Sequence, residues 1–195
     1  MNAIPDSWAH RICNEAGLQV TLEHIPPKGL TSPFLYQAVP GAPSPIDVRF
    51  LVARDREDRI IHSQGMRLDF IDGGLHRHMA ELFDPHWRRY GGIDRLPQDL
   101  ANVTGHCVYR GSFSLAPQWR DRDLVMALAE LGGDLTPGIW PEAKTSWAVF
   151  ERPSMRYGLP GMAGYSSLEP VGLIWEGWLD PHDSVATSML CRRAT

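Results

Sequence analysis

Histidines gather in the middle of the chain, so a metal site is the first chemistry to consider. Five of the eight histidines lie between His62 and His106, and the runs HRH at 76–78 and DPH at 84–86 combine imidazole and carboxylate groups that suit zinc or iron. On a strand, His76 and His78 would share one face, whereas on a helix two such residues diverge by about 200°. The apolar residues around them are spaced for a helix. We therefore expect no metal site.

A second candidate for chemistry is a carboxylate in the most apolar part of the chain. Glu176 stands among Leu173, Ile174, Trp175 and Trp178, where an unpaired carboxylate would be costly. If Arg110 or Arg152 pairs with it, the pair is structural or anchors a ligand. Without a basic partner, its pKa should rise and it could act as an acid or a base. Glu176 and Arg110 are accordingly the candidate catalytic residues.

The order of three residue types along the chain resembles the layout of ADP-ribosyltransferases. Arg110 in the run YRGS, Ser166-Ser167 and Glu176 follow one another as an arginine, serines and a glutamate on successive strands. The resemblance implies a small enzyme with a cleft around Glu176, Arg110 and the mid-chain histidines, either ADP-ribosyltransferase-like or metal-dependent. This enzyme is the alternative to the binding function considered below.

Composition and motifs exclude several other functions. The net charge of −4 comes from 23 acidic and 19 basic residues that are interspersed along 195 residues, which argues against nucleic-acid binding. The basic and aromatic run from Trp87 to Tyr90 is interpreted as a solvated helix end. No G-x-S-x-G elbow, Walker or dinucleotide pattern is present, so we expect no cofactor. The start of the chain has no secretory pattern and no segment approaches a membrane span, so we expect a cytoplasmic protein.

The elements that must position these residues are predicted from periodicity, caps and turns. Helices are predicted at 6–16, 75–83, 97–103 and 121–131, the last ending at Gly132-Gly133. Strands are predicted at 18–23, 48–52, 60–61, 106–115, 146–151 and 171–179. Those at 48–52 and 60–61 should form a hairpin, and 171–179 should form a C-terminal hairpin with 185–192 through a turn at 180–183. The strand at 106–115 should have one polar face that carries His106, Arg110, Ser112 and Ser114. We predict a single α+β domain over residues 1–195, with a mainly antiparallel sheet and three or four short helices.

Two long segments rich in proline and glycine interrupt this pattern, at Ile25–Pro45 and Arg152–Pro170. Long irregular connections are uncommon in a compact domain and often bind ligands or partners. Both segments carry large apolar residues, and the predicted contact residues are Phe34, Tyr36, Met155, Tyr157, Met162 and Tyr165. The sequence therefore favours a soluble protein-interaction module that binds a macromolecular partner through these loops, with self-association left open.

Overall fold

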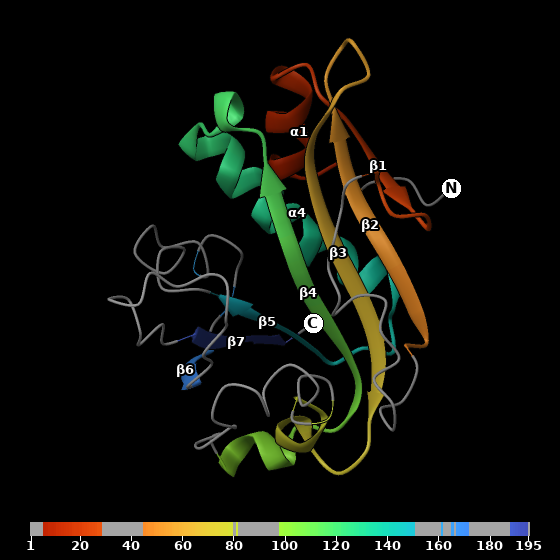
Figure 1. Cartoon of the computed structure of the whole chain (residues 1–195), viewed down its shortest axis with the longest axis vertical. Helices are drawn as coiled ribbons and strands as arrows, with labels where there is room; N and C mark the ends of the chain where they lie inside the picture. Colours follow the sequence, from red (N-terminus) through yellow and green to blue (C-terminus); the bar gives the residue numbers. More distant parts are fainter. Residues whose placement is uncertain are drawn as a thin grey trace.

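Seven strands form one sheet in the part of the chain that the structure describes (Figure 1). The structure is a computed structural model that describes residues 6–28, 45–79, 81, 98–150, 161, 165, 167–171 and 188–194, with the backbone alone at 98–99, 150, 167–171 and 188–194. The strands are β1 (Gln19–Glu23), β2 (Asp47–Arg54), β3 (Ile60–Ile71), β4 (Gly105–Leu115), β5 (Thr145–Phe150), β6 (Ser167–Val171) and β7 (Ser188–Ala194). Their order across the sheet is β1-β2-β3-β4-β5-β7-β6. Neighbouring strands are antiparallel except β4 and β5, which are parallel. The predicted α+β class and mainly antiparallel sheet are confirmed.

Helix α1 (Trp8–Glu15) begins and ends close to its predicted limits. The Ser7 hydroxyl caps it by accepting a hydrogen bond from the His10 amide at 3.2 Å. Gly17 follows the helix with φ +74°, a left-handed conformation in which glycine carries no steric penalty. The cap and the stop are both local signals, which explains why the sequence predicts this helix well.

The β2–β3 hairpin is also confirmed, but its second strand is much longer than predicted. The Asp55 carboxylate organises the turn by accepting hydrogen bonds from the Glu57 and Arg59 amides at 3.0 and 2.9 Å. Strand β3 then runs to Ile71, with β2 on one side and β4 on the other. Its central residues include the buried polar side chains Ser63, Gln64, Arg67 and Asp69, which break the apolar alternation that reveals a strand.

Helix α4 (Arg122–Ile139) begins as predicted and continues beyond the predicted end at Gly132-Gly133. At Gly132 the helix lies so close to the sheet that an added Cβ would overlap Gln64 Oε1 and stand 3.0 Å from Arg110 Nη2. Glycine is required here for close packing, so it does not mark a helix end. The 3-10 helix η1 (Gln98–Asn102) matches the short helix predicted at 97–103, and a second one, η2 (Pro117–Trp119), joins β4 to α4.

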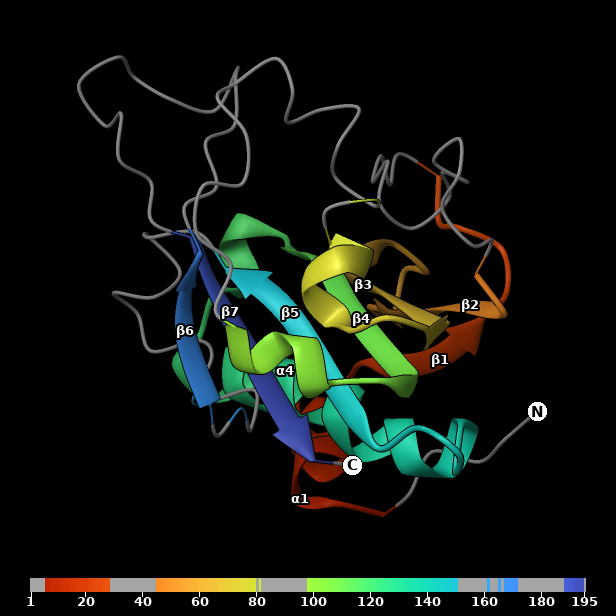
Figure 2. The ribbon, with the colours of Figure 1, turned by 90° about the horizontal axis from the view of Figure 1, so that it is seen from below.

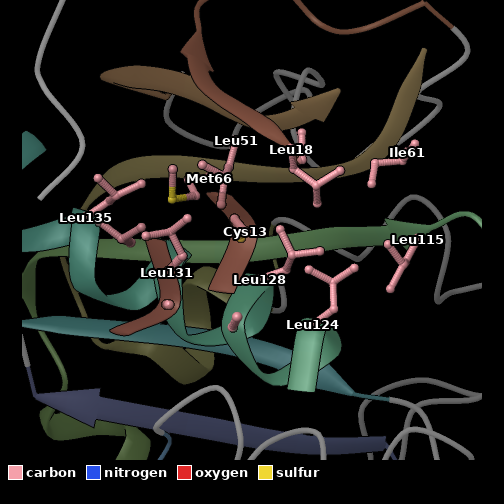
Figure 3. Packing of buried hydrophobic residues seen from close by; sticks show 14 of the residues in the cluster. Cys13, Leu18, Leu51, Ile61, Met66, Leu115, Leu124, Leu128, Leu131 and Leu135 are labelled. Carbon is pink, nitrogen blue, oxygen red and sulfur yellow. The ribbon is translucent and has the colours of Figure 1, made fainter. Parts of the chain in front are cut away.

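Helices α1 and α4 pack together on one face of the sheet (Figure 2). Leucines 124, 128, 131 and 135 of α4 meet Cys13 of α1 and side chains from β2, β3 and β4 (Figure 3). This apolar contact removes a continuous set of side chains from water and supplies the main stabilisation of the two layers.

The opposite face of the sheet is covered near its end by the helical residues 75–79. His78 of this segment lies edge-on to Trp147 of β5, with ring centroids 6.4 Å apart, and approaches Asp69 of β3. Asp69 forms an ion pair with Arg67, and both side chains are fully buried. The predicted helix at 75–83 is confirmed as far as the structure describes it.

Other predictions fall partly or wholly on residues that the structure leaves undescribed. The predicted central strand at 171–179 overlaps the described chain only at Val171, where β6 ends, and β6 is an edge strand. Residues 29–44 and 151–160, which form much of the two proline-rich segments, are also outside the described ranges. Among the helices that are described, none is long and apolar enough to cross a membrane.

Candidate active site

The two parallel strands at the centre of the sheet separate after a short contact. Strands β4 and β5 pair only at Cys107–Thr145, Val108–Ser146 and Tyr109–Trp147. Beyond these pairs β4 continues to Leu115 along β3, and β5 continues to Phe150 along β7. The edge of β4 that faces β5 therefore has no strand partner after Tyr109 among the described residues. Figure 1 shows β4 and β5 running apart, and we call the region beyond the Tyr109–Trp147 pair the strand opening.

A bulge in β4 lies at the strand opening. The register between β3 and β4 shifts between Ser63 and Gly65, and Ser112 has φ +56°. An extra residue in one strand reverses the alternation of side chains beyond it. Accordingly Val108 and Leu115, which an uninterrupted strand would place on opposite faces, both belong to the core beside α4.

Aromatic side chains surround the start of the opening. The rings of Tyr109 and Trp147 are 4.7 Å apart and tilted by 48°. A Cβ added at Gly111 would overlap the Tyr109 hydroxyl, so the phenol extends along β4 over Gly111. Burial, and then the neighbouring Tyr165, raise the pKa of Tyr109, and only Arg67 opposes this shift. Tyr109 therefore keeps its proton at neutral pH.

Arg110 is not on a polar face, which corrects the prediction for β4. Its side chain is 1% exposed, its Nη2 donates a hydrogen bond to the Ala129 carbonyl of α4, and its guanidinium carbon lies 5.3 Å from the Tyr165 ring centroid. Tyr165, expected on a loop that contacts a partner, is itself buried and 7% exposed. The two residues connect α4 to the strand opening.

The histidines do not converge. His76 lies beside Gly74, His78 beside Asp69, and the His106 ring contacts Phe70 with centroids 5.1 Å apart. In the described ranges no group of three His, Cys, Asp or Glu side chains could hold a metal ion. His86 lies outside those ranges. The mid-chain histidines that the structure describes thus do not line a common cleft.

The remaining predicted site residues cannot be placed. Glu176, Phe34, Tyr36, Met155, Tyr157 and Met162 all lie outside the described residues. Conversely, the sequence did not single out Tyr109, Gly111 or Trp147 as site residues. One signal was available, since the glycine in YRGS interrupts a strand pattern and glycine within a strand often marks a bulge.

The first turn of α4 lies near the strand opening. Asp121 is its N-cap, and its carboxylate accepts hydrogen bonds from the Asp123 and Leu124 amides at 2.9 and 3.3 Å. Asp123 adds a second acidic side chain to this turn. Arg120 Nε donates a hydrogen bond to the Leu115 carbonyl at 3.4 Å, which ties the helix start to the end of β4.

The architecture with two separating parallel strands is a GNAT-like fold. No model of a known protein family matches the chain, and no curated protein sequence matches it. Two solved structures of Arabidopsis thaliana NAA60 are similar in fold, one with a bisubstrate analogue and one with acetyl-CoA. They have TM-scores of 0.52 and 0.51, and each is 14% identical over 90% of this chain and 98% of the other. An agmatine N-acetyltransferase mutant is 14% identical over 75% of this chain and 74% of its own, with a TM-score of 0.49.

This likeness corrects the functional prediction made from the sequence. The fold had been interpreted as a scaffold that displays two loops to a protein partner, with an ADP-ribosyltransferase-like or metal-dependent enzyme as the alternative. In the NAA60 structures the same fold holds acetyl-CoA or a bisubstrate analogue, which are small molecules. The protein-interaction interpretation, its protein partner and the ADP-ribosyltransferase layout are therefore abandoned.

Proposed function

We propose that this protein is an acyltransferase that moves an acetyl group from a pantetheine thioester, such as acetyl-CoA, to an amine. The observation that carries the proposal is the separation of β4 from β5 after three pairs, in a GNAT-like fold. An unpaired strand edge can bind an extended, amide-bearing molecule as if it were an added strand. The two amides of a pantetheine arm suit such an edge. The acyl donor replaces the earlier expectation that no cofactor is used.

The residues of the opening suit binding and proton transfer. Backbone groups from Gly111 to Phe113 would hold the arm, since they follow the last pair with β5. Trp147, which is fully buried beside Tyr109, excludes water from the start of the opening. When the amine attacks the acyl carbon and the C–S bond breaks, the pantetheine thiolate leaves. The Tyr109 hydroxyl retains its proton at neutral pH and could donate it to that thiolate. The donor, when bound, supplies an activated acyl carbon.

Transfer can be measured directly. The purified protein is incubated with acetyl-CoA carrying ¹³C in the acetyl group and with a panel of primary amines, namely polyamines, amino acids and peptides with free N-termini. Mass spectrometry should detect a labelled N-acetyl product from at least one class. Absence of any product, together with no binding of acetyl-CoA or acetyl-pantetheine, would overturn the proposal.

A pair of hydroxyl deletions tests the site. Tyr109→Phe should lower the rate of transfer by 10-fold or more, within the range that a positioned acid contributes. Thr21→Val is the control, because it removes a hydroxyl on the edge strand β1, at the far side of the sheet. Equal activity of both variants and the wild type would remove Tyr109 from the mechanism. A cytoplasmic location, expected from the sequence, remains part of this proposal.

A further inference from the structure

The amide donors at the start of α4 are already used within the chain. The first four amides of a helix have no partner in the preceding turn, and they form the usual site for a phosphate group. Here the Asp121 side chain accepts from the Asp123 and Leu124 amides, and the Asp121 carbonyl accepts from the Val125 amide at 2.9 Å. Only the Arg122 amide is left without a partner inside this turn.

The carboxylate at the N-cap is also unfavourable for a phosphate at the helix start. A carboxylate at the N-cap is stabilised by the helix dipole in the way that a phosphate would be. Asp121 therefore occupies the position of a bound anion. The exposed side chains of Arg122 and Asp123 beside it carry opposite charges, so the capping carboxylate decides the local preference. The nearby Arg120 is directed to the Leu115 carbonyl.

The same turn is close enough to the strand opening to meet a bound donor. Arg110, at the opening, contacts Ala129 of α4, and Arg122 precedes Ala129 by seven residues. At 1.5 Å per residue, the helix starts about 10 Å from that contact. Figure 1 shows the start of α4 beside the tip of β4. A diphosphate attached to a pantetheine arm in the opening would approach the Asp121 carboxylate.

We propose that the acyl donor is recognised through its pantetheine arm alone, and that Asp121 excludes a diphosphate from the start of α4. This inference rests on the proposed acyl transfer and specifies how the donor is held, namely by its pantetheine arm with no contribution from a diphosphate at the start of α4. Asp121 acts as a specificity determinant: by occupying the helix amides it removes the preference for acetyl-CoA over acetyl-pantetheine that free amides would confer.

Two ligands and two variants test this role. Binding of acetyl-CoA and of acetyl-pantetheine, which lacks the diphosphate and the nucleoside, is measured by calorimetry at pH 7. The wild type should bind the two within five-fold of each other. Asp121→Gly frees the amides and removes the charge, and it should tighten acetyl-CoA by 10-fold or more while acetyl-pantetheine changes by less than two-fold.

Two further substitutions distinguish the effect of negative charge at the helix start from the effect of the hydrogen bonds that occupy its amides. Asp121→Asn keeps the capping oxygen and removes the charge, so it should tighten acetyl-CoA by only two- to three-fold. Asp123→Asn removes a charge that caps nothing, and it should have a still smaller effect. Glycine and asparagine are both favourable N-caps, so these variants should remain folded, which denaturant unfolding verifies.

The outcomes distinguish this inference from the proposed function. If the wild type binds acetyl-CoA more than five-fold tighter than acetyl-pantetheine, or if Asp121→Gly tightens acetyl-CoA by less than 10-fold, the role of Asp121 is wrong and acyl transfer stands. If neither ligand binds and no amine is acetylated, the proposed function fails and the donor class fails with it.

Discussion

At Gly132, α4 packs closely against side chains of the sheet, and substitution of this residue tests that packing. Gly132→Ala would place a methyl group against Gln64 Oε1, so we expect a loss of about 1–3 kcal/mol of unfolding free energy from overpacking. Gly138→Ala in the same helix is the control, because nothing lies within 4 Å of its added Cβ. It should stabilise by up to about 1 kcal/mol, since alanine has the higher helix propensity. Denaturant unfolding of both variants measures the difference.

The buried ion pair between Arg67 and Asp69 should be sensitive to loss of one partner. Arg67 Nε lies 2.8 Å from Asp69 Oδ1 and 2.9 Å from Oδ2. Asp69→Asn would remove the negative charge that Arg67 contacts here, and we expect a cost of about 3–5 kcal/mol in urea unfolding. Glu81→Gln breaks the largely exposed pair with Arg77 and should change stability by less than about 0.5 kcal/mol. Comparable effects of the two changes would contradict the burial of the first pair.

His62 should make stability depend on pH. Burial lowers its pKa from 6.5 to about 4, against a smaller opposing effect of its hydrogen bond with the Ser114 carbonyl. Below pH 6.5 the unfolded chain therefore binds a proton that the folded chain binds only near pH 4. The contribution of His62 to the free energy of unfolding therefore keeps its full value above pH 6.5. It falls as the pH drops through 4, by up to about 3 kcal/mol, because protonation of His62 favours the unfolded chain.

The variant His62→Asn isolates this effect from the carboxylates that titrate in the same range. Its amide can still donate to the Ser114 carbonyl, while the titrating ring is removed. The difference in unfolding free energy between wild type and variant, measured from pH 7 to pH 4, should shrink or reverse as the pH falls. A difference that stays constant over this range would refute the low pKa.

At the scale of elements, the bulge in β4 depends on the backbone conformation of Ser112. A left-handed conformation at φ +56° costs a residue with a Cβ about 1–2 kcal/mol, and β-branched residues more. Ser112→Gly should be neutral or stabilising by up to about 1 kcal/mol, whereas Ser112→Val should destabilise by about 2 kcal/mol or more. Thermal unfolding of the two variants tests the bulge, and equal stability of both would show that it is absent.

At the scale of the whole molecule, the reactivity of two buried thiols shows whether both faces of the sheet are covered. Cys13 lies in the core between α1 and α4, and Cys107 lies on β4 with its side chain on the other face. Burial raises the pKa of Cys13 to about 11, and burial with the nearby Asp69 raises that of Cys107 to about 12. Both should therefore be unreactive thiols at pH 8.

Labelling with a disulfide reagent measures this protection. In a Cys191→Ser background, the folded protein should show no fast-reacting thiol, and the denatured protein should show both remaining cysteines. Fast labelling of Cys13 alone in the folded state would mean that α1 detaches locally from α4. Fast labelling of Cys107 would mean that the face over β4 is open.

The sequence by itself determined the elements whose signals are local. Ser7 and Gly17 delimit α1, and Asp55 closes the turn of the β2–β3 hairpin. Each of these acts on backbone groups within a few residues, so its effect can be predicted without the rest of the chain. The apolar stripe of α4 and its acidic start are equally local, and they gave the correct beginning of that helix.

Only the tertiary structure decided what depends on contacts between distant segments. Gly132-Gly133 looks like a helix end until Gln64 and Arg110 are seen to occupy the space beside it. Arg110 looks solvent-exposed until α4 and Tyr165 are seen to cover it. The strand opening exists because β4 pairs in parallel with β5 for three residues and then leaves it. Strand pairing across such separations depends on the packing of every layer, and a pattern within one strand carries no information about its neighbour.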